Sequence, residues 1–393
     1  MIQFNNTSLK SFLTDFWQKK PLVLRNALPH FESHLSAEAL AGLSLEEEIE
    51  SRIVIQHEKK SYQLFKGPFT SQTYEKLPDT NWTLLIQGVD RLIPEVTELL
   101  NEFDFLPRWR IDDIMISYAV KGGNVGPHFD HYDVFLLQAA GQRNWKLTSQ
   151  NCTIDNAIQG IDLRLMETFN VEEDFTFKAG DILYIPPKWG HHGIALDDEC
   201  ITYSIGYRSY KGQELWDSFG DHLCEMNAFK DLYIDPIWPE HLNTAEITNA
   251  ASLQAQSLLQ NILQDDHLIK TWFGRFATQL DQQATYQLPE PLTEAEVPSF
   301  NEFLKTVQVE TGFIKDPVCR FAYSNIKHQD NKAQTLLYIN GTIWNSFGAS
   351  PLFIAQLANQ SFLTPKDIRQ ACQNENNIKL LFDLWTLQYL RKV

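Results

Sequence analysis

Two histidines and one aspartate are the residues of this chain best suited to chemistry. His128 and Asp130 are separated by a single residue, and His191 follows 63 positions after His128. In a β-strand, residues two apart point to the same face, so His128 and Asp130 can address one ion. Two imidazoles and one carboxylate can hold one face of Fe(II) and leave three positions open, an arrangement called the 2-His-1-carboxylate facial triad. The sequence therefore predicts a non-heme iron centre, provided that the three side chains converge.

The distal histidine lies in the stretch GDILYIPPKWGHHG, residues 180–193. A Gly-Asp turn, a short apolar strand and a Pro-Pro break precede it, which suits a barrel whose closing strand returns beside the first. His192 competes with His191 for the role of third ligand. Because adjacent residues on a strand face opposite sides, only one of the two can enter the barrel.

An arginine in the same region points to an anionic ligand. Alternation along residues 143–147 places Arg143 on one face with Trp145 and Leu147. Burying a guanidinium there costs free energy unless an anion pairs with it. A dicarboxylate could provide that anion, because a guanidinium forms bidentate hydrogen bonds with a carboxylate. Ser117, on an earlier strand, could add a hydroxyl to the same carboxylate. The alternatives are a structural ion pair for Arg143 and an ordinary strand hydroxyl for Ser117.

The first two hundred residues alternate short apolar runs with turn signals. Many short strands at close intervals predict a jelly roll or barrel. Helical periodicity predicts two helices that decorate it, at 37–49 and 94–103. The expected strands are 21–25, 53–55, 83–87, 113–119, 133–138, 144–147, 181–185 and 201–207.

The pattern becomes helical after residue 210. Apolar residues recur every three or four positions from 215 to 226 and again along 249–280. The second stripe needs a partner surface, either its own domain or a dimer seam. Residues 286–297 are rich in proline and glutamate and predict a linker. A hairpin at 335–344 with an Asn-Gly turn and helices at 353–357, 365–373 and 378–390 predict a module similar to a winged helix.

Composition excludes several classes of protein. The 393 residues exceed a typical single domain, and 43% hydrophobic with 21% charged residues is typical of globular chains. The first residues lack the pattern of a signal peptide and no later stretch is long and apolar enough to span a bilayer, so we expect a cytoplasmic protein. Five widely spaced cysteines indicate neither a disulfide framework nor a zinc site.

The net charge of −17 disfavours general nucleic-acid binding and suits cationic partners. It is unevenly spread, because residues 310–393 hold nine Lys/Arg against six Asp/Glu, while residues 1–309 hold 24 against 44. A charge of +3 is too small for the many phosphate contacts that duplex binding requires. We therefore expect no direct DNA binding, and a protein-docking or structural role for the C-terminal module.

Three stretches, with the order of strands around them, resemble the Jumonji C (JmjC) oxygenases. The resemblance is closest to the bacterial ribosomal oxygenases, which hydroxylate an arginine of a large-subunit ribosomal protein. It rests on FWQKKPLVLRNALP at 16–29, DDIMISYAVKGGNVGPHFDHYDVFLLQ at 112–138 and YSIGYRS at 203–209. The resemblance implies an α+β multidomain chain: a double-stranded β-helix barrel of the cupin type at 1–210, a helical dimerisation region at 211–290 and a winged-helix domain at 291–393.

The same resemblance implies the chemistry. His128, Asp130 and His191 would be the iron ligands, and Arg143 and Ser117 would bind 2-oxoglutarate. With O2 as cosubstrate, the enzyme would hydroxylate the β-carbon (C3) of an arginine in the sixteenth protein of the large subunit, giving succinate and CO2, and would act as a homodimer. One departure from the family pattern is His192, at a position where a different residue is expected.

Three other functions remain open at this point. The chain could hydroxylate a histidine of another ribosomal protein, could be a metal cupin that does not use 2-oxoglutarate, or could be a non-catalytic docking module. The residues that contact the substrate are not identified by the sequence. Three acidic residues near the motif could receive a cationic side chain or could be structural: Asp112, Asp113 and Asp133.

Overall fold

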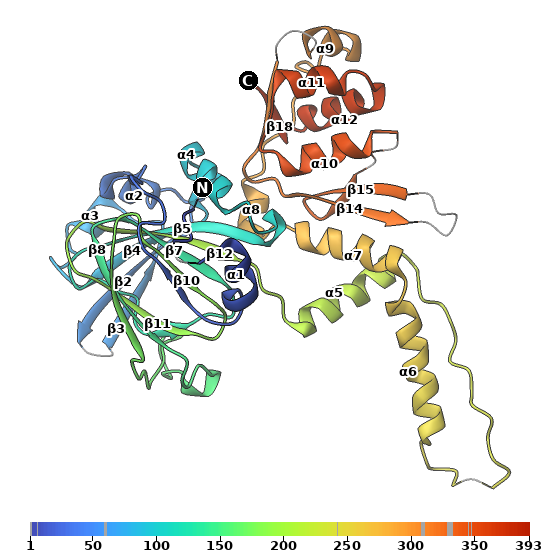
Figure 1. The fold of residues 1–393 in the computed structure, drawn as a ribbon, viewed down its shortest axis with the longest axis horizontal. Helices are drawn as coiled ribbons and strands as arrows, with labels where there is room; N and C mark the ends of the chain where they lie inside the picture. Colours follow the sequence, from blue (N-terminus) through green and yellow to red (C-terminus); the bar gives the residue numbers. More distant parts are fainter. Residues whose placement is uncertain are drawn as a thin grey trace. The chain divides into compact units, whose positions relative to one another are not determined.

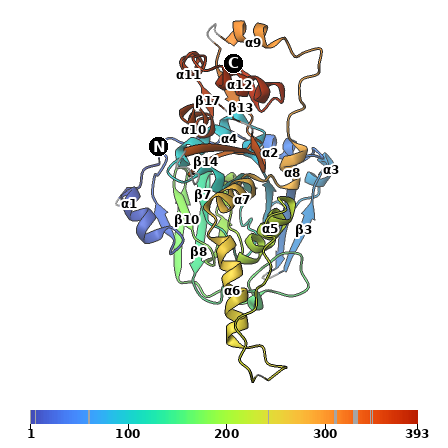
Figure 2. The same ribbon diagram turned by 90° about the vertical axis from the view of Figure 1, so that its right-hand side faces the viewer.

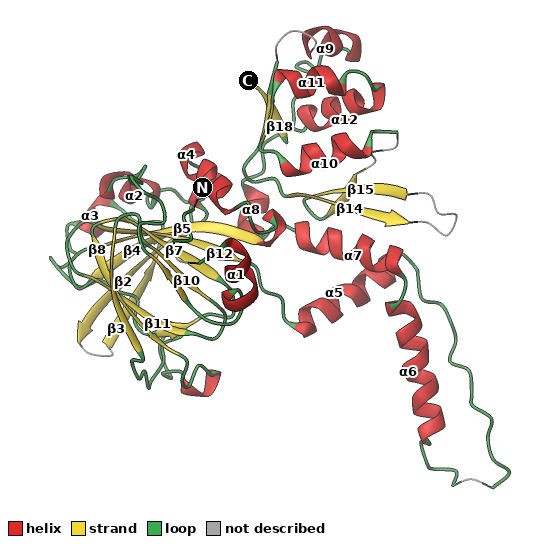
Figure 3. Ribbon diagram, viewed as in Figure 1, coloured by secondary structure: helices red, strands yellow, loops and turns green. Residues whose placement is uncertain are grey.

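The computed structural model describes every residue except 1, 6, 59–60, 242, 308–310, 328–332, 345 and 347. The chain forms two compact units, Met1–Ser209 and Tyr210–Val393. Strands dominate the first unit and helices the second (Figures 1 and 3). The three-part division expected from the sequence stays a prediction.

Unit 1 is built from two antiparallel sheets. The larger has the order β1-β10-β7-β12-β5-β4-β2-β3 and the smaller the order β6-β11-β8-β9. The strands are β1 (Leu22–Leu24), β2 (Ser51–Glu58), β3 (Ser61–Lys66), β4 (Trp82–Ile86), β5 (Ile111–Ala119), β6 (His128–Phe129), β7 (Val134–Ala140), β8 (Gln142–Thr148), β9 (Glu173–Lys178), β10 (Ile182–Ile185), β11 (Gly190–Ala195) and β12 (Cys200–Tyr207).

Short helical segments accompany these sheets. Several of their apolar side chains, such as Phe12, Leu40 and Phe103, belong to one core cluster with the outward face of the larger sheet. The segments are α1 (Leu9–Ser11), η1 (Phe12–Phe16), α2 (Ala37–Leu43), α3 (Ser71–Tyr74), η2 (Val89–Arg91), α4 (Pro94–Leu99), η3 (Leu100–Phe103), η4 (Arg108–Arg110) and η5 (Ile154–Asn156).

Strand β7 shows why the two sheets stack. Phe135 and Leu137 belong to the outer core with the helical layer, whereas Val134 and Leu136 pack with Trp145 and other residues of the smaller sheet. A strand buried on both faces reads as a continuous apolar run, which is the sequence VFLLQAA. The face shared by the two sheets is the interior of the barrel, and the predicted jelly roll is confirmed.

The predictions differ from the structure where the local sequence pattern is weak. Strands β3, β6, β9 and β11 were absent from the expected set, because β3 and β9 are half exposed, β6 has only two residues and β11 carries two glycines and two histidines. His128 and His191 were nevertheless expected to lie on strands. The expected helix 37–49 ends at Leu43. The expected helix 378–390 ends at Thr386, and the chain then forms a strand that pairs with Phe313–Lys315.

Unit 2 combines helices with two three-stranded sheets, ordered β17-β13-β18 and β14-β15-β16. The helices are α5 (Gly212–Glu225), α6 (Asn249–Leu263), α7 (Asp266–Thr278), α8 (Gln282–Tyr286), α9 (Phe300–Val307), α10 (Pro351–Asn359), α11 (Pro365–Ala371) and α12 (Glu375–Thr386). The strands are β13 (Phe313–Lys315), β14 (Phe321–Lys327), β15 (Ala333–Ile339), β16 (Thr342–Trp344), β17 (Phe362–Leu363) and β18 (Leu390–Lys392).

Two details of unit 2 follow directly from its sequence. The helical pattern at 249–280 is two helices rather than one, because Asp265 accepts a hydrogen bond from the Leu268 N–H and so begins α7. The predicted hairpin is confirmed: Asn340 and Gly341 take φ values of 50° and 80° between β15 and β16, as a two-residue turn with left-handed backbone requires.

Helix α7 packs on this hairpin sheet. The Tyr338 hydroxyl donates to the Lys270 carbonyl oxygen at 3.0 Å, and Gly274 lies against the Tyr338 ring so closely that a Cβ there would lie 2.3 Å from it. Helix α6 and residues 227–241 and 243–248 instead extend away from the rest of unit 2 in both views (Figures 1 and 2). Among the described residues, no helix has the length and apolar character needed to cross a membrane.

Candidate metal centre

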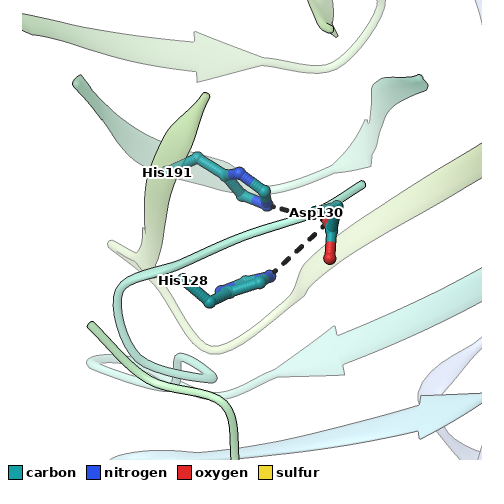
Figure 4. A group of neighbouring side chains, drawn as sticks. All are labelled: His128, Asp130 and His191. Carbon is teal, nitrogen blue, oxygen red and sulfur yellow. Dashed lines mark ion pairs between the residues drawn. The ribbon is translucent and has the colours of Figure 1, made fainter. Parts of the chain in front are cut away.

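The three predicted ligands meet inside unit 1. The Nε2 atoms of His191 and His128 lie 3.5 Å and 3.9 Å from the same carboxylate oxygen of Asp130. One ligand atom from each residue falls within 4.8 Å of the other two, and all three side chains converge on one point (Figure 4). The donor set of two imidazoles and a carboxylate fits Fe(II). The convergence expected from the sequence is observed, while the role of these residues as ligands remains a proposal.

Strand pairing brings the histidines together. Strand β6 pairs with β11 in a register that sets His128 opposite His191. Asp130 lies just beyond β6, where its carbonyl oxygen accepts a hydrogen bond from the Lys188 N–H at 2.8 Å. The loop between β10 and β11 therefore holds the aspartate beside the paired histidines.

Backbone carbonyl groups orient both imidazoles. The Nδ1 of His128 lies 2.9 Å from the Gly126 carbonyl oxygen, and the Nδ1 of His191 lies 3.1 Å from that of Trp189. A carbonyl oxygen only accepts, so Nδ1 carries the proton in each ring and Nε2 keeps its lone pair. Burial and then the neighbouring His128 lower the pKa of His191 to about 4, which keeps that imidazole neutral. Neutral imidazole is the form that binds metal.

Arg143 is buried beside the centre with an unused donor. It is 3% exposed on β8, its Nε donates to the Cys200 sulfur at 3.3 Å, and its guanidinium carbon lies 5.6 Å from the Trp145 ring centre. Among the described residues, the buried Nη2 of Arg143 has no hydrogen-bond partner. No anion in the described part of unit 1 is seen to pair with it, so the site fits the carboxylate of a bound ligand.

Ser117 shares this environment less directly. Its hydroxyl is buried and donates to the Thr202 carbonyl oxygen at 3.4 Å. Ala119, two residues further along β5, packs against Ala195 and Cys200, and Ala195 lies opposite Arg143 in the sheet. Ser117 therefore lies on the face of β5 that looks towards the arginine, and its role in binding remains a proposal.

Sequence reasoning missed the residues that hold Arg143. Cys200 also accepts a hydrogen bond from the Gln138 side chain at 3.4 Å, and Gln138 accepts one from Thr202 at 3.1 Å. Alternation along β7 places Gln138 inside the barrel with Leu136, and this alternation is the sequence signal that could have identified Gln138. Nothing in the sequence marks Cys200, because its partners are 57 and 62 positions away.

The other candidates lie outside the ligand cluster. His192 is turned to Asn124, with its Nε2 3.1 Å from the amide oxygen. His131 is exposed. Asp133 is buried and accepts hydrogen bonds from Tyr184 and Gln18 at 2.6 Å and 3.1 Å, which is a structural role.

Asp112 and Asp113 differ in their surroundings. Asp112 pairs with Arg208 at 2.9 Å. Asp113 is buried and accepts hydrogen bonds from the Gln87 side chain and the Gly88 N–H at 2.7 Å and 2.8 Å. Burial, and then the nearby carboxyl groups of Asp90 and Asp112, raise the pKa of Asp113 to about 7.

Known proteins share this fold and sequence. Residues 98–215 match the JmjC domain family. The ribosomal protein uL16 3-hydroxylase of Escherichia coli is 36% identical over 280 residues, which are 71% of this chain and 74% of that protein. The chain belongs to the JmjC ribosomal oxygenase family. A second relative, the probable ribosomal oxygenase of Haemophilus influenzae, is 36% identical over 55% of this chain and 53% of its own length.

Solved structures of this family extend the match to the whole chain. A crystal structure of the ribosomal oxygenase YcfD from E. coli superposes with a TM-score of 0.84 at 29% identity and covers 100% of this chain and 99% of that one. Another YcfD structure, in complex with cobalt and 2-oxoglutarate, has a TM-score of 0.79 at 29% identity and covers 98% of both chains. Residues 98–215 thus match a JmjC cupin domain within a full-length fold like that of YcfD.

The unused donor of Arg143 generates a prediction. Arg143→Lys removes the planar fork, so we expect 2-oxoglutarate to bind roughly 10-fold to 100-fold more weakly, the effect of losing a charge-assisted hydrogen bond. Calorimetric titration of the Mn(II)-loaded protein under anaerobic conditions measures this affinity. Arg108→Lys is the control, because Arg108 pairs with Asp104 in the outer helical layer. Equal affinity in wild type and Arg143→Lys would exclude the guanidinium as the carboxylate anchor.

Proposed function

We propose that this chain is an Fe(II)- and 2-oxoglutarate-dependent oxygenase that hydroxylates the β-carbon of an arginine in the large-subunit ribosomal protein uL16. The observation that carries the proposal is the convergence of His128, Asp130 and His191 in the same barrel as a buried arginine with an unused donor. The 36% identity to the uL16 3-hydroxylase supports the choice of substrate. A cupin that does not use 2-oxoglutarate would leave the buried Arg143 without a function.

The residues divide the work between binding and exclusion of water. His128, Asp130 and His191 would hold the metal, and Arg143 with Ser117 would hold the far carboxylate of 2-oxoglutarate. When bound, iron and 2-oxoglutarate supply the oxidation, in which one oxygen atom of O2 enters a C–H bond and the other enters succinate as CO2 leaves. The apolar side chains between the sheets keep the interior dry, and the protein contributes orientation rather than acid or base chemistry.

Mass spectrometry of uL16 tests the function. Purified protein with Fe(II), 2-oxoglutarate and a uL16 fragment should add one oxygen atom to an arginine, and His128→Ala should abolish this because two protein ligands hold iron poorly. The matched control is His57→Gln, since His57 is an exposed histidine bonded to Gln63. Addition of oxygen to a histidine of another ribosomal protein instead would contradict the proposed substrate.

We further propose Asp113 as the group that meets the substrate guanidinium. It lies four residues before Ser117 on β5, and therefore on the same face of that strand. The carboxylate of Asp130, then burial, and then the carboxylate of Asp113 raise the pKa of Tyr132, so both acids act electrostatically on that tyrosine. Burial and the carboxyl groups of Asp90 and Asp112 outweigh the nearby Arg91 guanidinium at Asp113, so its ionised form costs stability, and a substrate cation would offset that cost.

Replacing this carboxyl group should therefore stabilise the protein in a pH-dependent manner. The folded-state pKa of Asp113 lies above its unfolded value, so its contribution to the unfolding free energy is present below about pH 4 and is lost as the pH rises through about 7. Asp113→Asn should gain a few kcal/mol at pH 8 and little at pH 4, because a tenfold change in a proton-binding constant corresponds to roughly 1.4 kcal/mol. Urea unfolding at both pH values measures this.

The same variant should bind the uL16 fragment more weakly, because it has lost the charge that faces the guanidinium. Asp104→Asn is the control, since Asp104 forms a partly exposed pair with Arg108. A gain that is equal at both pH values would refute the pKa argument, and unchanged fragment affinity would refute the substrate role.

We also propose a homodimer formed through α6 and residues 227–241 and 243–248. Among the described residues, α6 buries none of its side chains, although five of its fifteen are Leu or Ile. In the preceding segment Ile237 is 100% exposed and Leu232 82%. A second copy is the occupant that fits, because a two-fold axis covers the same apolar patch on both chains at once.

Charged substitutions in this surface should separate the subunits. Ile237→Lys combined with Leu253→Glu should change the mass in solution from two chains to one, since each charge would be buried without a partner. Light scattering after gel filtration measures the mass. Leu352→Lys is the control, because Leu352 is 69% exposed on α10. A wild-type protein that is monomeric at micromolar concentration would refute the dimer.

The C-terminal part of unit 2 has the helices and hairpin of a winged helix, which we propose as its fold type, with a role in docking protein rather than DNA. The charge of +3 over residues 310–393 supports this choice. Action on a ribosomal protein also favours the cytoplasm as the place of action.

A further inference from the structure

Asn124, in the loop before His128, is the centre of a buried hydrogen-bond network. Its side chain is 1% exposed. Its Oδ1 lies 2.9 Å from the Gly126 backbone nitrogen, 3.0 Å from the Tyr62 hydroxyl and 3.1 Å from Nε2 of His192. Its Nδ2 donates to the Gly122 carbonyl oxygen at 2.8 Å and to the Gln56 side chain at 2.7 Å.

The backbone partners fix the direction of these bonds. The Gly126 N–H can only donate and the Gly122 carbonyl can only accept, so the orientation of the Asn124 amide is determined. His192 must then donate from Nε2, because it faces the amide oxygen. The proton of His192 is thereby assigned to the nitrogen that faces the loop.

The network continues into the metal centre through Gly126. This residue donates its N–H to Asn124, and its carbonyl oxygen accepts the Nδ1–H of His128 at 2.9 Å. Gly126 has a φ of +80°, a backbone conformation that costs other residues energy and that needs fixed neighbours. The peptide units around Gly126 therefore transmit the position of Asn124 to the ring of His128.

Strand β11 carries His191 and His192, whose side chains point to opposite faces of the strand. His191 points into the barrel and faces Asp130, whereas the next residue, His192, points to the other side and reaches the loop. Gly122 and Gly123 are bonded to Ala195, near the end of the same strand, at 2.9 Å and 3.0 Å. Strand β11 thus carries His191, a proposed metal ligand, and also holds the loop that orients His128.

We propose that His192 is a positioning residue, which through Asn124 and Gly126 holds the His128 imidazole in the tautomer and orientation that a metal requires. This inference rests on the proposed function, since it assumes that His128 binds metal. It assigns a role to His192, a residue that departs from the family pattern expected from the sequence. Outer partners of ligating histidines typically contribute 10-fold to 100-fold to metal affinity.

Two substitutions separate a hydrogen-bonding role from a packing role. His192→Phe keeps an aromatic ring against Phe169, whose ring centre lies 6.2 Å away, but cannot donate to Asn124. His192→Gln retains a donor. We expect Mn(II) to bind roughly 10-fold or more weakly to the Phe variant and with nearly wild-type affinity to the Gln variant, as measured by electron paramagnetic resonance of free Mn(II).

Hydrogen exchange provides a readout that needs no metal. In the metal-free protein, the Gly126 amide should exchange faster in His192→Phe than in wild type and His192→Gln, because its acceptor is no longer fixed. Thermal unfolding verifies that each variant is folded, and His57→Gln is the control for loss of a histidine bonded to a side-chain amide.

A double-mutant cycle with Asn124→Leu distinguishes positioning from direct ligation. If His192 acts through Asn124, both single variants weaken Mn(II) binding and the double variant loses little more. Additive losses, unchanged affinity in His192→Phe, or unchanged Gly126 exchange would each overturn the inference. Failure of wild type to bind Mn(II) would instead refute the proposed function, and the exchange measurement would still decide whether His192 holds the loop.

Discussion

The pairing of β6 with β11 is the constraint on which the candidate site depends. It is only two residues long on the β6 side, yet its register places His128 opposite His191. A shift of one residue would present Gly190 or His192 to the barrel, because side chains alternate between the faces of a strand. The larger pairing of β11 with β8 secures this register, and the same pairing sets Ala195 opposite Arg143. One alignment of strands therefore determines the geometry of both the proposed metal ligands and Arg143, the proposed anchor of the carboxylate.

Burial gives the site its chemistry and also makes it costly. Arg143 and Asp113 are both nearly inaccessible to solvent, and burying the charged form of each side chain costs free energy relative to water. The surrounding cores offset this cost, since Phe135, Tyr184 and Tyr207 interlock on the outer face of the larger sheet. A rigid, strongly apolar scaffold thus tolerates a buried Arg143 donor that has no partner among the described residues and that, under the proposed function, a bound carboxylate would satisfy.

The sequence predicted the parts of this structure that leave a strong local pattern. Strands β7 and β10 are continuous apolar runs, and the spacing of His128, Asp130 and His191 pointed to one ion. Strand β11 has no such pattern, because its glycines and histidines reflect close packing and function rather than strand propensity. The helix predicted at 378–390 runs past the end of α12 at Thr386 to Leu390, the first residue of β18, where pairing with β13 overrides the helical periodicity.

Under the proposed function, strand β11 also connects two binding events. His191 lies near its start, and Ala195, at its end, faces Arg143 while bonding the glycine loop that leads to His128. A ligand that orders one end of so short a strand lowers the conformational entropy that the other end must lose when the second ligand binds. Metal and 2-oxoglutarate should therefore bind with positive cooperativity, and the coupling free energy must be the same whichever of the two binds first.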